Sequence, residues 1–267
     1  MYLDIHTREG LAEHEPAIAE LFAACFGREL SLPEWRWFYL DNPLGAAYVA
    51  LHYEGARLLG HYAVVPTQFM CNGTPFLAYR SMTTMVHPDV KVPGLFLTLA
   101  KRVNAQLLAD NASLVYGFPN KNSALGFRRF LNWTLPPADP VVDLSGAEML
   151  ADPALLAALT ARAEIEWDSG DPLQAAWRNS RPGAHSTAAP GLVVKPFDGV
   201  LNVLHIGAEG AASIVPDATY RLMLPADFRP EAMQPRARFH YQFGFRVIDP
   251  QYEGRAFRRE LIMSDVF

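Results

Sequence analysis

The sequence has little cysteine and no strong excess of charge. Its 267 residues include two cysteines, Cys25 and Cys71, and neither belongs to a CxxC pair or to a cysteine/histidine spacing. We therefore expect buried, reduced thiols and neither a disulfide framework nor a structural zinc site. The formal net charge is −5, which argues against nucleic acid as the main partner, because binding its backbone requires a basic surface.

Long hydrophobic runs are also lacking. No stretch of the sequence approaches the ~18 apolar residues of a membrane-spanning helix, and residues 1–16 do not have the basic-then-apolar order of a signal peptide. These features predict a cytoplasmic protein with no membrane partner. Half of the residues are hydrophobic and 12% are aromatic, so the chain can bury a sizeable core.

The first half of the chain predicts a strand, an amphipathic helix and then four antiparallel strands. Period-two alternation indicates strands, and apolar residues three or four apart indicate helices. Asn72-Gly73 between two strand-like runs is a strong hairpin signal. The predicted strands lie at 1–7, 47–53, 58–65, 68–71, 76–86 and 113–118, and the predicted helices at 16–26, 94–107 and 123–130.

The second half has a different composition. Beyond Pro136-Pro137, alanine, proline and acidic residues dominate up to about Gly183. We expect mixed α and β structure there, and we divide the chain into residues 1–134 and 135–267. The predicted helix lies at 153–163, and the predicted strands lie at 191–194, 200–206, 218–224, 239–247 and 257–263.

The junction at residues 83–96 carries the clearest chemical signal. It runs from a strand through a loop into a helix, where free backbone N–H groups and the helix dipole favour an anion. Lys91 adds a positive charge, and Gly94 permits close approach of a ligand to the backbone. A diphosphate would fit, although an ordinary strand–helix connection could contain the same residues.

This junction resembles the acetyl-CoA-binding motif of the GNAT N-acetyltransferase superfamily. The motif has Gln or Arg, two variable residues, Gly, one more residue, and Gly or Ala. Lys91-Val92-Pro93-Gly94-Leu95-Phe96 occupies it, with a lysine and a phenylalanine as the two departures. Residues 114–118, 119–123 and 131–133 look like the family's fifth strand, its asparagine-led helix and its closing aromatic element. The resemblance covers about residues 1–134.

The fold that the resemblance implies is α+β. A GNAT-like mixed, mostly antiparallel central sheet would be flanked by helices, and the mixed α/β C-terminal half could form a second GNAT-like lobe. That half would complete the acceptor site or form an interface, and a homodimer is compatible with this arrangement.

A bacterial GNAT branch whose members N-acylate amino sugars offers a more specific resemblance. Trp35-x-Trp37-x-Tyr39, Asn42-Pro43-x-Gly45 and Tyr116-Gly117-Phe118-Pro119-Asn120 look like that branch, as does Trp177-Arg178 in the second half. The resemblance implies a nucleotide-linked amino sugar as the acceptor.

Position by position, the resemblance implies an acyl-CoA site. The backbone of the strand end would pair with the pantetheine arm like an added strand, and the loop amides would hold the pyrophosphate. One asparagine after the fifth strand would touch the CoA chain. The cofactor-binding candidates are Met85, Val86, Lys91, Val92, Pro93, Gly94, Leu95, Phe96, Asn120 and Asn122.

The general acid and base are less clear. The tyrosine that the family often carries after the fifth strand is replaced by Phe127 or Arg128, which leaves Tyr116 or water as the proton donor. An amine must lose a proton before it attacks, and His87 at the strand end could accept it. A histidine before a proline is also commonly structural, and His61 is a rival lining residue.

The acceptor pocket could be walled by aromatic side chains, because sugar rings stack on them. At helical spacing, the same aromatic cluster is also typical of a hydrophobic core. The substrate-binding candidates are Trp35, Trp37, Tyr39, Tyr79 and Arg80.

We therefore expect a CoA-dependent N-acyltransferase. It would move an acetyl or small acyl group from acetyl-CoA, or another acyl-CoA, to a small-molecule primary amine by direct attack in a ternary complex. We expect neither a metal nor an acyl-enzyme. Two alternatives stay open: N-acylation of an amino acid, peptide or polyamine, and a non-catalytic GNAT-like acyl-CoA-binding protein.

Overall fold

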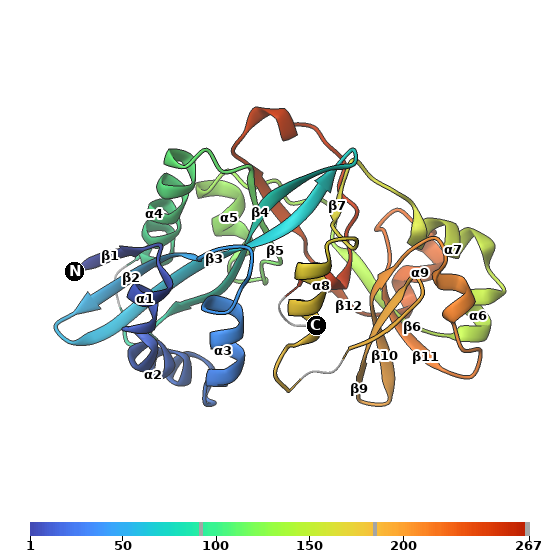
Figure 1. Ribbon diagram of the computed structural model, residues 1–267, viewed down its shortest axis with the longest axis horizontal. Coiled ribbons are helices and arrows are strands. Elements are labelled where there is room, and N and C mark those ends of the chain that lie inside the picture. The colour runs from blue at the N-terminus through green and yellow to red at the C-terminus, as the bar shows by residue number, and fades with distance from the viewer. Residues whose placement is uncertain (91–92, 184–185, 265–267) are drawn as a thin grey trace.

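The computed structural model describes residues 1–90, 93–183 and 186–264, which form two lobes, each built on a mixed sheet with helices beside it (Figure 1). In the described part of the chain, no helix is both long and apolar enough to cross a membrane. The helices are α1 (Arg8–Ala12), α2 (Glu15–Phe26), α3 (Leu32–Tyr39), α4 (Leu95–Ala109), α5 (Ala124–Phe130), α6 (Gly146–Leu150), α7 (Pro153–Thr160), α8 (Pro172–Asn179), α9 (Pro230–Met233), and the 3₁₀ turns η1 (Gly210–Ser213), η2 (Gln234–Arg236), η3 (Pro250–Tyr252) and η4 (Leu261–Met263).

The sheet of the first lobe is mostly antiparallel, and its parallel neighbours are β4 and β5. Its strand order is β1 (Tyr2–Ile5), β2 (Tyr48–Glu54), β3 (Arg57–Cys71), β4 (Thr74–Val86), β5 (Leu114–Gly117) and β13 (Gly244–Val247), with β7 (Ile165–Trp167) paired to the far end of β3.

The sheet of the second lobe repeats this plan with β10 and β11 as its parallel pair. Its strand order is β12 (Ala237–Tyr241), β6 (Asp139–Ser145), β11 (Thr219–Met223), β10 (Val200–Ile206), β9 (Leu192–Phe197) and β8 (Thr187–Ala189). The α+β fold predicted from the sequence, with mostly antiparallel mixed sheets flanked by helices, is confirmed.

One predicted pair of strands is a single long strand. β3 runs without a break through Pro66, where the sequence predicts an interruption. The pairing of β2 with β3 ends at Val64, and that of β7 begins at Phe69. Pro66 therefore lies where the outer edge of β3 has no partner strand, and its missing N–H costs no ladder bond. The hairpin at Asn72-Gly73 is confirmed, with φ of 49° and 84°.

The first sheet takes strands from the second half of the chain. β12 belongs to the second sheet, whereas β13, which follows it, returns to pair with β5 in the first sheet. The single strand predicted at 239–247 is wrong for this reason, because its two ends belong to different sheets. The strand predicted at 257–263 is also wrong, since those residues contain an isolated bridge and η4. The division at residue 134 stays a prediction.

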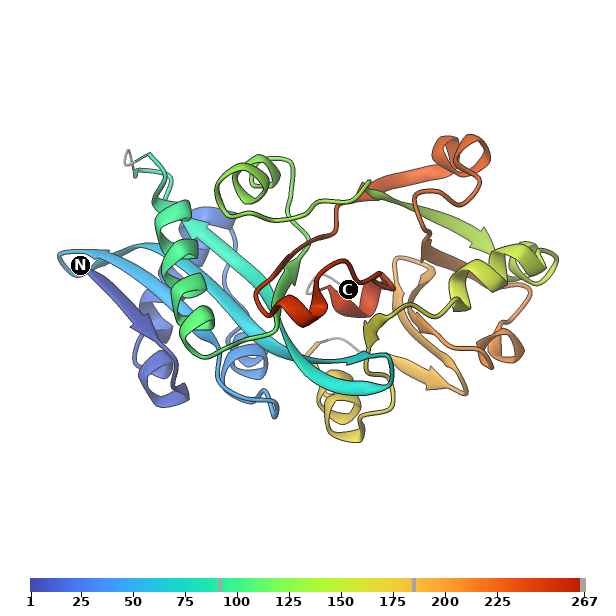
Figure 2. The ribbon, with the colours of Figure 1, turned by 90° about the horizontal axis from the view of Figure 1, so that it is seen from above.

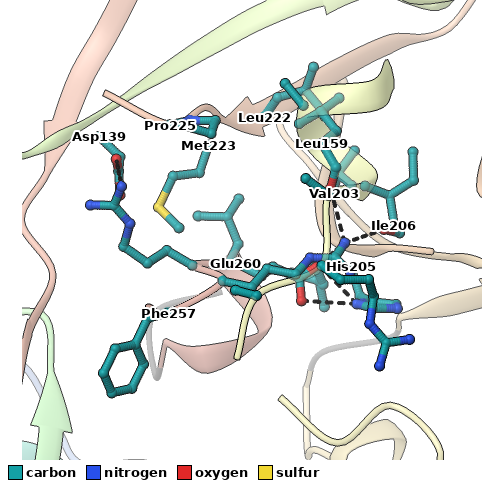
Figure 3. Close-up of a pocket in the computed structure, with 18 residues that line it drawn as sticks. Asp139, Leu159, Val203, His205, Ile206, Leu222, Met223, Pro225, Phe257 and Glu260 are labelled. Carbon is teal, nitrogen blue, oxygen red and sulfur yellow. Dashed lines mark hydrogen bonds and ion pairs between the residues drawn. The ribbon is translucent and has the colours of Figure 1, made fainter. Parts of the chain in front are cut away.

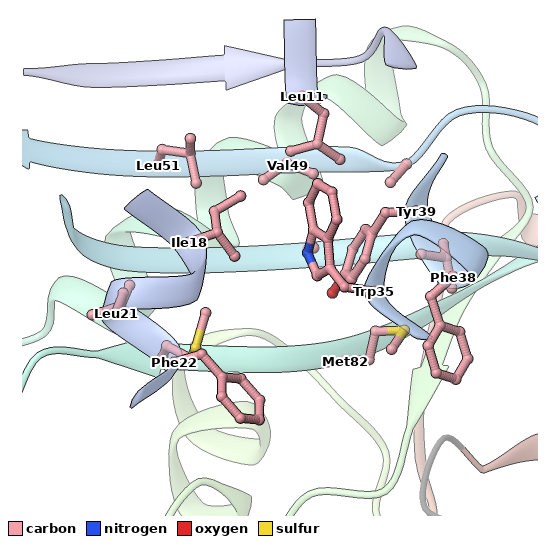
Figure 4. Close-up of a cluster of buried hydrophobic side chains, with 14 of the residues drawn as sticks. Leu11, Ile18, Leu21, Phe22, Trp35, Phe38, Tyr39, Val49, Leu51 and Met82 are labelled. Atoms are coloured by element: carbon pink, nitrogen blue, oxygen red, sulfur yellow. The ribbon is translucent and has the colours of Figure 1, made fainter. Parts of the chain in front are cut away.

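The core of the first lobe lies on both faces of its sheet. Alternate residues of β2 point to opposite faces, so Val49 and Leu51 meet α2 and α3, while Tyr48 and Ala50 meet α4 and α5. Figure 4 shows the first of these faces, where the side chains of α2 and α3 cover the strands. The sheet is thus a buried layer that positions the residues at its strand ends.

Two tryptophans hold α8 against α3. The indole N–H of Trp37 on α3 donates to the carbonyl oxygen of Trp177 on α8 (2.9 Å), and the indole N–H of Trp177 donates back to the carbonyl oxygen of Trp37 (3.1 Å). Their rings stack with centroids 4.5 Å apart. Both side chains are buried, so this contact fixes α8 against the first lobe.

Replacing Trp177 tests this contact. We expect Trp177→Ala to lower the free energy of unfolding by about 3–5 kcal/mol, because it removes a buried aromatic side chain. Trp177→Phe keeps most of the packing but loses the indole N–H, and it should cost about 1–2 kcal/mol. Urea unfolding monitored by circular dichroism measures both changes. Phe197→Ala, at an exposed site, is the control and should change stability by less than about 0.5 kcal/mol. Equal stability of all three variants would contradict the role of Trp177.

Candidate active site

A β-bulge shapes the end of β4. His61 of β3 pairs with Met85, but Ala63 pairs with Met82, so β4 contains one extra residue between these pairs. Thr83 in this bulge has a φ of 51°. A left-handed backbone is uncommon for a β-branched residue. The bulge bends the strand and re-aims the backbone that follows it.

His61 contacts the bulge from the neighbouring strand. Its Nδ1 lies 2.8 Å from the carbonyl oxygen of Thr83. Because a carbonyl oxygen only accepts hydrogen bonds, Nδ1 carries the proton. Complete burial lowers the pKa of His61 to about 4, so the ring is neutral near pH 7.

β4 and β5 are paired over only a short stretch. Their parallel pairing consists of Tyr79 with Val115 and Arg80 with Tyr116. Beyond it, the edge of β4 that follows Arg80 has no partner strand among the described residues. A Cβ on Gly117 would lie 3.1 Å from the carbonyl oxygen of Ser81, so glycine permits the close approach of the two strands where their pairing ends. We call the unpaired edge of β4 beyond this contact, next to the end of β5, the wedge.

α4 begins beside the wedge. Gly94 caps it with a φ of 79°, and the helix has neither a side-chain cap nor an acidic residue in its first turn. Its first amides are therefore available to an anion. Lys91 and Val92, both predicted to bind the cofactor, lie outside the described residues, while Pro93 precedes the cap.

The two hydrophobic motif residues pack into the lobe. Leu95 is buried in the core on the α4 face. The ring of Phe96 packs on Phe127 with centroids 5.1 Å apart. A Cβ on Gly126 would lie 3.0 Å from that ring, so glycine in α5 makes room for the phenylalanine that replaces the small motif residue.

The residues at the end of β4 and the asparagines after β5, which are predicted to contact acyl-CoA, have other partners in this structure. The thiol of Cys25 on α2 lies 3.4 Å from the carbonyl oxygen of Val86, and Met85 is buried in the core. Asn120 is exposed, and its Oδ1 accepts from the backbone N–H groups of Asn122 and Ser123 at 3.0 Å. Asn120 thus organises the turn that leads into α5, and both asparagines remain accessible.

The two catalytic candidates, His87 and Tyr116, contact different parts of the first lobe. His87 faces the β2–β3 turn, where Nε2 lies 2.7 Å from the guanidinium of Arg57 and Nδ1 accepts from the N–H of Asp89. Tyr116 is fully buried, and its ring meets Phe69 edge-on with centroids 5.1 Å apart. Their roles as base and acid stay predictions.

The five acceptor candidates do not share one surface. Trp35, Trp37 and Tyr39 are only 2–4% exposed and belong to the core. Tyr79 points to the opposite face of the sheet from Arg80, because neighbours along a strand alternate. It packs edge-on against Tyr48, and burial raises its pKa. A wall for a sugar would need open ring faces, which these three core residues do not offer.

Two arginines bind the segment at the end of the described chain, a contact that is not predicted from the sequence. The guanidinium of Arg80 donates to the carbonyl oxygen of Ser264 (3.3 Å) and lies 5.1 Å from the ring centroid of Phe38. Arg178 of α8 donates to the carbonyl oxygens of Ile262 and Ser264, at 3.1 and 2.7 Å. Figure 2 shows this segment between the two lobes. Arginine-to-carbonyl contacts across 184 and 86 positions leave no local sequence signal.

The second lobe has its own separation of parallel strands. β10 pairs with β11 at Leu201–Tyr220 and Asn202–Arg221, and a bulge follows between Val203 and His205. A cavity of about 210 Å³ lies there, lined by β10, β11 and residues 257–261 (Figure 3). η1, of four residues, stands between β10 and β11, where the first lobe has α4 between β4 and β5. Among the described residues, this connection therefore has no comparable helix start for a diphosphate.

Comparisons with known proteins agree with this geometry for the first half of the chain. Residues 6–135 match the family model described as "Acetyltransferase (GNAT) domain". This half of the chain is thus similar to a GNAT acetyltransferase domain. GNAT domains use acetyl-CoA as the acyl donor, and the wedge and the uncapped start of α4 fit such a ligand. The comparison with curated proteins gives no match.

Solved structures share the two-lobe fold over nearly the whole chain. A protein of Enterococcus faecalis titled a probable N-acyltransferase aligns with a TM-score of 0.63 and 10% identity, over 94% of this chain and 74% of that one. An N-acetyltransferase of the same superfamily from Kribbella flavida gives 0.59 and 13%, over 93% and 72%. A tandem GNAT protein from the clavulanic acid biosynthesis pathway gives 0.54 and 10%, over 93% and 99%. At these identities the likeness shows the fold.

Asp139, which lines the cavity of the second lobe, should make stability depend on pH. It is 1% exposed, and burial raises its pKa from 3.8 to about 6. The unfolded carboxyl loses its proton first, so the wild type loses stability as pH rises from about 4 to 6. We expect Asp139→Asn to raise the free energy of unfolding at pH 7.5 by at most about 3 kcal/mol, and to have little effect at pH 4.

Asp143 on the same strand is the matched control. Its hydrogen bond with Arg221 lowers its pKa, so its ionised form is favoured in the folded state. Asp143→Asn should therefore lower stability at pH 7.5, the opposite sign. Urea unfolding at pH 4 and 7.5 measures both variants. A loss of stability for Asp139→Asn at pH 7.5 would contradict the prediction.

Proposed function

We propose that the protein is a CoA-dependent N-acyltransferase that moves an acetyl or small acyl group to a primary amine of a small molecule. The wedge between β4 and β5, with the uncapped start of α4 beside it, is the observation that carries this proposal. A strand edge without a partner can pair with an extended ligand, and the adjacent helix start favours its phosphates.

The residues of this chain have separable tasks in that reaction. When bound, acetyl-CoA supplies an acyl group activated as a thioester. The backbone of Met85 and Val86 would hold the arm of the donor and present N–H groups to its carbonyl oxygen. The amides from Gly94 to Phe96 would hold the diphosphate. The amine must lose a proton, and His87 is proposed to accept it, directly or through water.

The finer proposal is that the acceptor is a nucleotide-linked amino sugar. It is supported by the resemblance of Trp35-x-Trp37-x-Tyr39 and Asn42-Pro43-x-Gly45 to the amino-sugar branch. Asn42 is buried, and its side-chain amide donates to the carbonyl oxygen of Pro66 (3.0 Å). The motif therefore shapes the loop between α3 and β2 and holds it against β3 at Pro66.

Gly94→Glu should weaken acetyl-CoA binding. The position has open space around it but a left-handed backbone, so the variant adds strain and a negative charge beside the proposed diphosphate site. We expect the dissociation constant from calorimetry to rise about tenfold or more. Gly55→Glu is the matched control, because Gly55 has a φ of 58°, also has open space, and lies in the β2–β3 turn. Equal affinities for both variants would argue against this site.

A panel of amines identifies the acceptor class. Free CoA released from acetyl-CoA is measured with a thiol reagent in the presence of amino-sugar nucleotides, free amino acids, short peptides or polyamines. We expect turnover with an amino-sugar nucleotide at a kcat/KM at least ~100-fold above that of the other amines. A preference for another group would overturn the sugar proposal. Saturable binding of acetyl-CoA without turnover of any amine would instead favour a non-catalytic binding protein.

A further inference from the structure

Thr83 holds an unfavourable backbone conformation at a place that matters for the wedge. The described residues with a positive φ other than glycine are Asn72, Thr83, Asn111, Asn132, Asp198 and Arg229. Asparagine and aspartate tolerate this region, and Thr83 is the β-branched member of the set. Such a conformation is unfavourable and persists only where the surrounding structure enforces it.

His61 is the group that meets this backbone from the neighbouring strand. Its ring is completely buried, and Nδ1–H donates to the carbonyl oxygen of Thr83 at 2.8 Å. Tyr39 of α3 packs edge-on against the same ring, with centroids 6.0 Å apart. The imidazole is thus fixed between a helix of the core and the bulge. Its hydrogen bond goes to the carbonyl of the left-handed residue itself.

The bulge lies between the two parts of the candidate site. It follows the last pair of β4 with β5, at Arg80 and Tyr116, and precedes Met85 and Val86. Side chains and backbone N–H groups alternate in direction along a strand. Losing the extra residue of the bulge would therefore turn the N–H groups of Met85 and Val86 to the opposite edge of β4. The N–H groups proposed to face the acyl donor depend on the bulge.

We propose that His61 is a positioning residue, which holds the carbonyl of Thr83 so that β4 beyond the bulge presents its backbone to the acyl donor. This inference rests on the proposed function. His61 does not touch the reacting atoms and transfers no proton. It acts by stabilising a strained backbone. Removing the hydrogen bond should therefore lower kcat, and removing the strain should restore it.

The experiment compares three variants. His61→Leu removes the donor and retains bulk, His61→Asn places an amide N–H near the position of Nδ1, and the double variant His61→Leu/Thr83→Gly replaces Thr83 by a residue that adopts the left-handed backbone without strain. We expect kcat to fall about 10–100-fold in His61→Leu, because small displacements of positioned groups cost that much. The dissociation constant for acetyl-CoA should change about threefold or less, since the start of α4 is untouched.

Rescue separates positioning from packing. His61→Asn should retain most of the wild-type kcat, and Thr83→Gly should restore a large part of what His61→Leu loses. His52→Leu is the control, because His52 is a buried histidine of β2 whose ring contacts Tyr2 instead, at a tilted angle. Full activity of His61→Leu would overturn the inference. So would a loss that neither Asn nor the Thr83→Gly background relieves.

Amide hydrogen exchange keeps this test independent of the proposed function. In His61→Leu, the segment 82–86 should exchange at least about tenfold faster than in the wild type, with α4 and β2 unchanged. If the wild type turns over no amine, the proposed function fails, and the exchange result still decides whether His61 holds the bulge. Unchanged exchange in 82–86 would overturn the inference.

Discussion

β4 and β5 touch through two residue pairs, and the candidate site follows from what happens just beyond them. Up to Arg80 the two strands are held side by side, and Gly117 lets the end of β5 lie against Ser81. Past this point β4 continues to Val86 along β3, carrying the bulge at Thr83. A longer parallel pairing would satisfy the backbone of β4 within the sheet and leave nothing for a ligand. The site is therefore a consequence of pairing that stops early.

Two strands of the second half of the chain join the first sheet, and they explain why the two halves fold as neighbours: β13 pairs with β5, and β7 pairs with β3. Residues 257–264 add a second connection. Arg258 and Glu260 bind Ile206 and His205 at the opening of the second lobe, and a few residues later Arg80 and Arg178 hold Ser264. Residues 257–261 thus line the cavity of the second lobe, and Ser264 contacts Arg80 of the first lobe.

Much of the first lobe could be predicted from local patterns. The helix after Gly94, the strand at 114–117 and the hairpin at Asn72-Gly73 follow from periodicity and from turn chemistry that acts over a few residues. Pro66 shows the limit of such reasoning, because whether a proline breaks a strand depends on which edge carries a partner. The aromatic cluster Trp35 to Tyr39 shows another, because the same spacing is typical of a core and of an exposed binding wall.

The sequence by itself determined the type of site: a strand, a loop with Gly94 and a helix whose first turn has no acid, a pattern that resembles the GNAT motif. These features are local, so they depend only on neighbours along the chain. The tertiary structure alone decided which groups surround that site. Trp37 meets Trp177, His61 meets Thr83, and Arg80 meets Ser264 across separations of 140, 22 and 184 residues. Such contacts depend on how separate segments of the chain pack together, which no single segment encodes.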